Sequence, residues 1–363
     1  MKRLRDLILF FAFIGPLSVF AVPTEFAFER VPSRFETLEL TAGSRALGET
    51  CYSFGTMPDG TVCNSAFLPE VTQGSLMGRV FLGNGYAALT AANQMVYQPI
   101  SKEFLQSLFE HQNVTSLEAH VGLVFTGPRF SAAFSPYRVQ YLSEVHNPNF
   151  PVVAVHAAVE RSFSFSSGFT LEELSGQLSD FSVGTRLRLL ERTYVHGTFS
   201  LFQALTDNPR DLLPVQIQKG IFVDPTVAWA KKDLKWSPRV SLGVKNLGHL
   251  FPQTSLYPER PDFGFGFGLE PPLEVGQLKL GLDVVDLIHG PEGGGALSRF
   301  RVGSTYHLGI MDMMLGWNKS AVSAGVQFGI QVVQVGIVYE FLRSELNENT
   351  TENRIATEFS VRL

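Results

Sequence analysis

Cys51 and Cys63 are the two cysteines of the chain, and they flank the turn residues Pro58-Asp59-Gly60. A bond between them would close a loop of about 13 residues and stabilise the folded chain by roughly 3 kcal/mol in the chain-entropy account. A disulfide, a redox-active pair and two free thiols all remain open, and we favour the disulfide if the chain is exported. We expect no metal here, because no nearby His or second Cys pair completes a ligand set.

Charged side chains also recur on the polar faces of alternating segments, where they would point into a barrel. These candidate lumen-lining residues are Glu118, His120, Arg138, Arg186, Arg188, Lys245, Lys279, Asp283, Arg301, Glu340, Glu358 and Arg362. They could line a passage, or they could pair across strands and fill the interior. Their mixed signs favour pairing, since a selective pore shows a ring of one sign.

Catalytic chemistry has little support in the sequence. It contains no Gly-x-Ser-x-Gly, no His-Glu-x-x-His and no phosphate-binding loop, so we predict no catalytic residue and no cofactor. Barrel hydrolases carry Ser, His and acidic residues on neighbouring strands. A barrel enzyme that uses His120, His156, His196 or His307 is therefore our third hypothesis.

The N-terminus predicts export. Residues 1–21 combine Lys2, Arg3 and Arg5 with an apolar run from Leu7 to Ile14 and a small-residue cleavage context at Ala21. Cleavage removes three cations and one acid, so the mature chain is more acidic than the formal net charge of −5. Because phosphate binding needs clustered Lys and Arg, we expect no nucleic-acid partner.

The rest of the chain alternates with a period of two. Hydrophobic residues make up 45% of the sequence and charged residues 17%, yet no later run is long enough for a membrane helix. The segments 322–330, 333–341 and 355–363 show the alternation most clearly. We count about fourteen such segments, many of 9–12 residues, which is the length that crosses a bilayer when tilted. The predicted fold class is all-β: a transmembrane antiparallel β-barrel of about fourteen strands.

Three segments break the alternation. Ser101–Gln112 spaces its apolar residues as one helical face behind a Ser N-cap, and Thr170–Glu173 is a capping box that opens a short helix to about Leu178. Thr206–Gln218 is interrupted by proline and predicts a loop. Long barrel loops face outward, where they can carry ligand or partner contacts.

The stretch from Leu40 to Leu68 also cannot be a strand, and it carries a resemblance. Ala42-Gly-Ser-Arg-Ala-Leu-Gly48, followed by Asn64-Ser-Ala-Phe-Leu68, resembles the N-terminal signature of the long-chain fatty-acid transporter (FadL) superfamily, which includes PorV-like and TraF-like barrels. Glu49, Ser65 and Phe67 depart from the signature, so the chain resembles a divergent member.

The resemblance implies a hatch segment that closes the barrel. The domains would be a signal peptide at 1–21, a hatch at 22–74 and a transmembrane barrel at 75–363. The positions that match the signature are Gly43, Arg45, Gly48, Asn64 and Ala66. They would shape the hatch as it opens or closes, or Arg45 and Asn64 would hydrogen-bond backbone carbonyls and hold a fixed plug.

These patterns together predict a protein of the Gram-negative outer membrane, in contact with its lipid. The leading hypothesis is passage of a hydrophobic or amphipathic small molecule through a hatch-gated lumen. The alternative is an interaction barrel that does not transport and acts as a shuttle or scaffold for a secreted or surface protein.

Overall fold

The structure is a computed structural model that describes residues 41–58, 60, 62–83, 97, 101–109, 115–146, 151–175, 180–252, 261–287, 296–330, 332–343 and 351–362. The predicted signal peptide lies outside the described residues and stays a prediction. No helix in the described ranges is both long and apolar enough to span a membrane.

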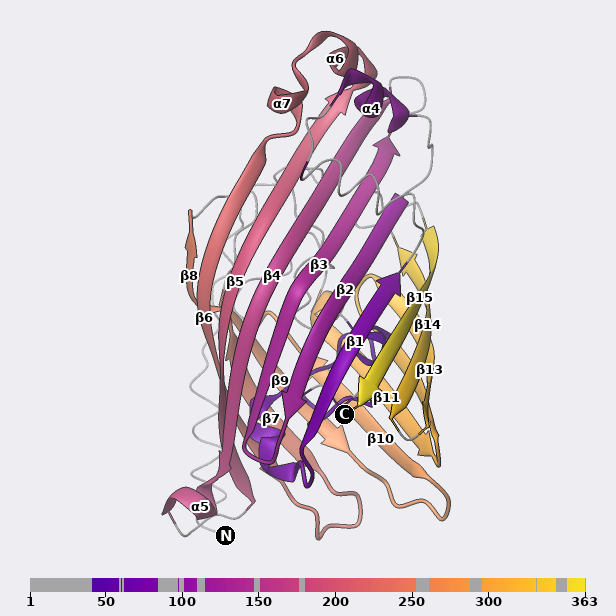
Figure 1. Cartoon of the computed structure of the whole chain (residues 1–363). Helices are drawn as coiled ribbons and strands as arrows, with labels where there is room; N and C mark the ends of the chain where they lie inside the picture. Colours follow the sequence, from indigo (N-terminus) through magenta and orange to yellow (C-terminus); the bar gives the residue numbers. More distant parts are fainter. Residues whose placement is uncertain are drawn as a thin grey trace.

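Antiparallel strands form a closed barrel (Figure 1), as the period of two predicts. β1 pairs with both β2 and β15, and β5 pairs with β6, so that within the described residues fourteen strands close the ring and β8 is an extra strand. The predicted fold class and strand number are confirmed. The strands are β1 (Ser75–Gly83), β2 (Thr115–Thr126), β3 (Phe130–His146), β4 (Val152–Thr170), β5 (Phe181–Ser200), β6 (Val215–Ala230), β7 (Arg239–Lys245), β8 (Leu247–Phe251), β9 (Asp262–Leu269), β10 (Gln277–Val284), β11 (Phe300–Leu308), β12 (Met311–Trp317), β13 (Ala321–Ile330), β14 (Val333–Arg343) and β15 (Thr351–Arg362).

Short helices lie at both ends of the barrel and inside it. They are α2 (Ala42–Ala46), η3 (Ser65–Glu70), α4 (Lys102–Ser107), α5 (Leu171–Ser175), α6 (Leu201–Thr206), α7 (Pro209–Leu212) and η4 (Ala296–Arg299). In Figure 1, α4, α6 and α7 lie at one end, which we name the loop end, and α5 lies at the other, the turn end. Outer-membrane barrels place short turns in the periplasm and longer loops outside the cell.

Local capping chemistry fixes several of these helices. Ser101 accepts a hydrogen bond from the Phe104 N–H and starts α4 as predicted. Thr170 and Glu173 exchange both hydrogen bonds of the predicted capping box at α5. The predicted loop 206–218 is wrong in part, because α7 interrupts it and its last four residues begin β6. β6 starts early because Val215–Gln218 finds a full ladder partner on β5.

The outer wall carries an apolar band that ends at a row of charged side chains. Toward the turn end, the outer faces of β4, β5 and β6 expose Phe163, Phe165, Phe169, Phe181, Leu187, Leu189, Ile221, Val223 and Val227. Arg161, Glu191 and Lys219 follow in cross-strand register and form a charged row. Lys219 and Glu191 are 71% and 49% exposed and lie 3.5 Å apart. From Phe181 to the row the span is close to the apolar height of about 25 Å that a bilayer needs.

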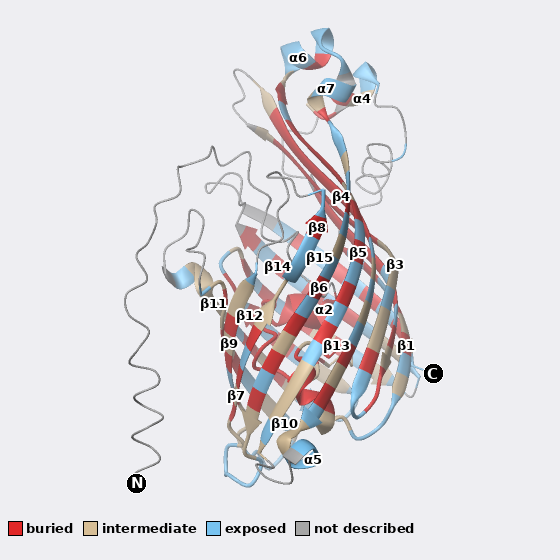
Figure 2. Ribbon diagram, turned by 90° about the vertical axis from the view of Figure 1, so that its left-hand side faces the viewer, coloured by how far each residue is buried: buried red, intermediate tan, exposed pale blue. Residues whose placement is uncertain are grey.

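Beyond the charged row, β2–β6 continue toward the loop end as a projecting sheet (Figure 2), which we call the extension. Its outer face carries a hydrophobic core that includes Val155, Ala157 and Val195. Leu105 of α4 and Ala204 of α6 belong to the same core, so these helices cover the face from outside. The extension thus has a packed apolar layer of its own on its outer face.

Candidate functional site: a hatch inside the barrel

The chain before β1 lies inside the barrel. We define the hatch as residues 41–71 in their described part, and it contains α2 and η3. Figure 1 shows this segment within the ring of strands. Nearly all its residues from Thr41 to Phe54, and from Asn64 to Leu68, are buried. Residues 22–40 of the predicted hatch lie outside the described residues.

The α2 half of the hatch carries a buried charge network. Arg45 forms ion pairs with Glu49 of the hatch and Glu118 of β2. Arg354 of β15 is 3.0 Å from Glu118 and also pairs with Glu340 of β14. Desolvation of such charges is offset only when every member is paired, so loss of one member would leave an uncompensated buried charge and cost about 3–5 kcal/mol.

Asp283 of β10 holds the centre of the hatch. Its carboxylate accepts hydrogen bonds from three successive backbone N–H groups, those of Cys51 at 2.5 Å, Tyr52 at 2.6 Å and Ser53 at 2.9 Å. Glu358 of β15 similarly accepts the Ala42 N–H at 2.6 Å at the start of α2. Two wall carboxylates therefore satisfy hatch donors that have no helix or ladder partner.

The η3 half of the hatch is joined to the opposite wall. Cys51 and Cys63 form a disulfide, as we favoured, with Cα atoms 5.3 Å apart. Asn64 caps η3 and donates from its side chain to the Tyr52 carbonyl at 3.1 Å. The hydroxyls of Ser65 and Thr226 of β6 lie 3.0 Å apart. Arg186 of β5 donates to the Val62 carbonyl at 2.5 Å.

Inward-facing glycines let the hatch approach the wall closely. A Cβ built on any of them would lie 2.9 Å or less from a hatch atom, too near for an undistorted contact. We name this set the glycine belt: Gly168, Gly184, Gly264, Gly266, Gly281, Gly303, Gly316, Gly325 and Gly336. The belt lies on β4, β5 and β9 to β14, so the hatch approaches the wall closely on both of these sides of the lumen.

The predicted hatch residues have different surroundings. Gly43 is buried within α2, and Gly48 follows that helix with φ of +61° against the Trp317 backbone. The Ala66 N–H donates to Asn64 Oδ1 and Thr226 Oγ1. Arg45 contacts carboxylates rather than backbone carbonyls, whereas Asn64 does reach a carbonyl.

Most of the predicted lumen-lining residues have a charged or polar partner. Arg138 lies 3.7 Å from Glu160, Arg188 lies 3.9 Å from Asp224, and Arg301 lies 3.6 Å from Glu49. His120 lies 2.7 Å from the Ser135 hydroxyl, and Lys245 lies over the Tyr52 ring. Lys279 and Arg362 instead line a cavity on the turn-end side of the hatch.

Sequence reasoning missed Arg354. It also missed the ion pair between Arg192 of β5 and Glu160 of β4, in which a guanidinium nitrogen lies 2.9 Å from a carboxylate oxygen. Arg354 and Glu358 are four positions apart, so on a strand both side chains point to the same face. Arg354 lies one position before the first residue of the predicted last strand. A strand extended by one residue would have found it.

The fold has counterparts among solved structures. The Pseudomonas putida toluene transporter TodX matches with a TM-score of 0.51 at 10% identity, over 88% of this chain and 97% of that one. The CymD monoaromatic hydrocarbon channel matches with a TM-score of 0.46 at 12% identity, over 90% and 97% of the two chains. No family model and no curated protein sequence matches the chain.

The chain shares its antiparallel barrel fold with the TodX structure. That statement agrees with the resemblance in its hatch sequence. At 10% identity the likeness to TodX shows the fold alone. Outer membrane phospholipase A from Escherichia coli matches with a TM-score of only 0.34, over 56% of this chain and 78% of that one at 12% identity, which is too dissimilar to support an enzyme.

Proposed function

We propose that the barrel passes a hydrophobic or amphipathic small molecule across the outer membrane, and that displacement of the hatch opens the route. The observation that supports this most is how the hatch is held. Hydrogen bonds and ion pairs join it to the wall around the ring, and water can replace such polar contacts when the hatch moves. An apolar cluster that joins Ala46 and Phe54 of the hatch to Met314 of the wall must separate in the same movement.

The names of the similar structures support the same proposal. TodX is named a toluene transporter and CymD a monoaromatic hydrocarbon channel. The outer wall here exposes a lipid-facing apolar band, so the barrel is suited to sit in the membrane through which such solutes must pass.

The test is uptake by liposomes that contain the purified barrel, measured with several labelled apolar solutes and a fatty acid. Uptake equal to that of empty liposomes for every solute would refute passage. A second arm locks the hatch with Ser65→Cys and Thr226→Cys, whose hydroxyls are 3.0 Å apart. Oxidation should abolish uptake in the double variant and leave each single variant unaffected, with the new bridge verified by peptide mass spectrometry.

If uptake survives the lock, the solute does not need the hatch to move. That result would preserve passage and refute gating by the hatch.

An interaction barrel is the second candidate function, and the extension favours it. α6 exposes Leu201, Phe202 and Leu205 beyond the charged row, with Phe202 72% exposed. An apolar patch outside the membrane is typical of a protein contact. Co-purification of a stable partner from native membranes that is lost with Phe202→Ser would support this function, and its retention in that variant would exclude this patch as the contact.

A further inference from the structure

A cavity of about 350 Å³ lies between the hatch and the wall at the turn end. Thr56, Met57 and Pro58 of the hatch form one side. The other sides come from the ends of β10 to β15 and the turn at Gly309 and Ile310.

The charges of the cavity are unbalanced. Lys279 and Arg362 carry positive charge, and neither side chain has a hydrogen bond or ion pair with the described part of the chain. Asp312 is the one carboxylate among the lining residues, and His307 already contacts it at 2.8 Å. Among the described lining residues, two cations therefore stand against one carboxylate, and neither Lys279 nor Arg362 is paired with it.

Thr305 adds an independent observation. It is 6% exposed, and its hydroxyl is buried without a hydrogen-bond partner within the described residues. It lies directly opposite Lys279 in the β10–β11 ladder, so their side chains are neighbours on the same inner face. A buried hydroxyl without a partner is costly unless a ligand or water satisfies it.

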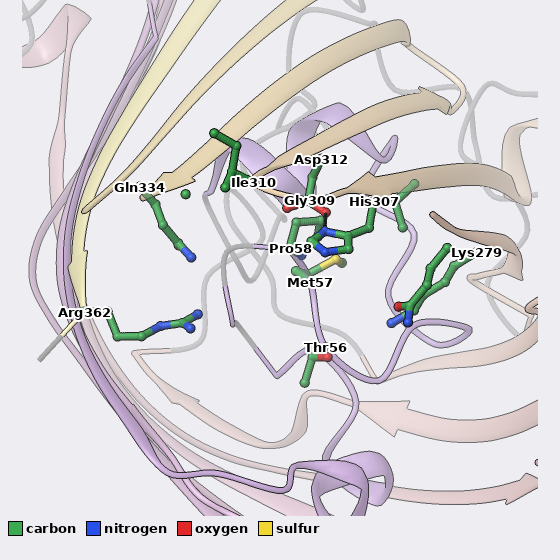
Figure 3. Close-up of a pocket in the computed structure, with 13 residues that line it drawn as sticks. Thr56, Met57, Pro58, Lys279, His307, Gly309, Ile310, Asp312, Gln334 and Arg362 are labelled. Carbon is green, nitrogen blue, oxygen red and sulfur yellow. Dashed lines mark hydrogen bonds and ion pairs between the residues drawn. The ribbon is translucent and has the colours of Figure 1, made fainter. Parts of the chain in front are cut away.

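Figure 3 shows how these groups surround the space. Arg362 and Gln334 lie on one side, Lys279 lies on the other, and Met57, Pro58 and His307 lie between them. A small molecule here would meet a cation on each of two sides of the space, with the apolar side chains of Met57 and Pro58 between them.

We propose that this cavity binds the anionic group of a small molecule on the periplasmic face of the barrel. Lys279 and the Thr305 hydroxyl are the donors on one side, and Arg362 is the cation on the other. The acceptor chemistry is a carboxylate or a phosphate. Because the ligand touches both the hatch turn and the wall, its binding stabilises the closed hatch. The inference does not rest on the proposed passage, since binding is measured on the purified barrel without transport.

The experiment uses the full-length barrel in detergent and a water-soluble probe pair, 4-fluorobenzoate and 4-fluorobenzyl alcohol. Binding is followed by fluorine NMR line broadening, with protein-free micelles as the blank. Hydrogen bonds to a charged group are stronger than those to a neutral group, so we expect the acid to bind about tenfold more tightly than the alcohol. Inorganic phosphate is then added as a competitor: displacement assigns phosphate as an accepted group, and no displacement assigns carboxylate alone.

Variants locate the site. Lys279→Gln and Arg362→Gln should each weaken acid binding by about tenfold, and Lys279→Arg should restore most of it. Thr305→Val should weaken binding with little change of side-chain volume. Lys235→Gln is the matched control, because it removes one exposed cation from the turn after β6 at the same end without touching the cavity. Heat-modifiable gel mobility verifies that each variant folds.

Equal binding of acid and alcohol by the unaltered protein would overturn the proposal. So would acid binding that persists unchanged in both Lys279→Gln and Arg362→Gln. Binding of the acid should also raise the melting temperature of the unaltered protein and not that of Lys279→Gln, and a rise in both would refute the bridge between hatch and wall.

Discussion

Single residues hold the hatch, and Asp283 is the clearest of them. One carboxylate receives three backbone donors of a segment that has no ladder of its own. The disulfide begins at Cys51, the first of these donors, so covalent and electrostatic anchors meet at one point. The wall thus supplies the acceptors that regular secondary structure would otherwise provide.

Asp283→Ala should loosen this anchor. Removal of the charged acceptor strands three buried N–H groups, and we expect a loss of about 3 kcal/mol or more in the stability of the seated hatch. Limited proteolysis with mass spectrometry should then cut within 41–74 much faster than in the unaltered barrel. Asp233→Asn, in an exposed turn, is the control. Identical cleavage rates in both variants would show that Asp283 does not anchor the hatch.

The glycine belt makes a second prediction at this scale. Gly184→Ala places a methyl group 2.3 Å from the Ser65 carbonyl carbon, so the hatch must shift or fail to seat. Gly329→Ala is the matched control, because its nearest neighbour is a Gln334 side-chain atom at 3.5 Å. We expect a lower melting temperature only for Gly184→Ala, and equal melting of the two variants would contradict close seating at that glycine.

At the scale of elements, β2–β6 each belong to the barrel wall at one end and to the extension at the other. β5 runs from Phe181 to Ser200, while β12 on the far wall runs only from Met311 to Trp317. The charged row of Arg161, Glu191 and Lys219 divides the lipid-facing half of the long strands from the extension. The same β6 outer face exposes Ile217 beyond the row and Val223 below it.

This division can be measured in proteoliposomes. A bimane label at Ile217→Cys should be quenched by a water-soluble quencher, and one at Val223→Cys by a lipid-borne quencher. The native cysteines are bonded to each other and do not compete for the label. Lipid quenching at both positions would move the membrane boundary past the charged row.

For the molecule as a whole, closure of the ring predicts cooperative resistance to detergent. All strand edges of the ring are paired, because β1 meets β15. The purified protein should therefore migrate as a compact species in unheated dodecyl sulfate gels and shift on boiling. A single mobility before and after heating, or extraction without detergent, would argue against a closed membrane barrel.

Sequence alone determined the barrel, about fourteen strands and the caps of α4 and α5. These features are encoded locally: the period of two is visible within one strand, and a capping box spans four residues. The inward glycines were visible too, interleaved with Phe263, Phe265 and Phe267 for example. Their role could not be predicted, because the hatch atoms that lie against each glycine are known only from the tertiary structure.

Only the tertiary structure decided which inward charges meet. Glu118 joins Arg45 and Arg354, and Asp283 receives the backbone at Tyr52, although these partners are far apart in the chain. Strand register and closure of the ring set those meetings, and neither can be read from a single strand. The cavity of Lys279, Thr305 and Arg362 has the same origin: six strand ends and one hatch turn form it, and no short stretch of sequence contains it.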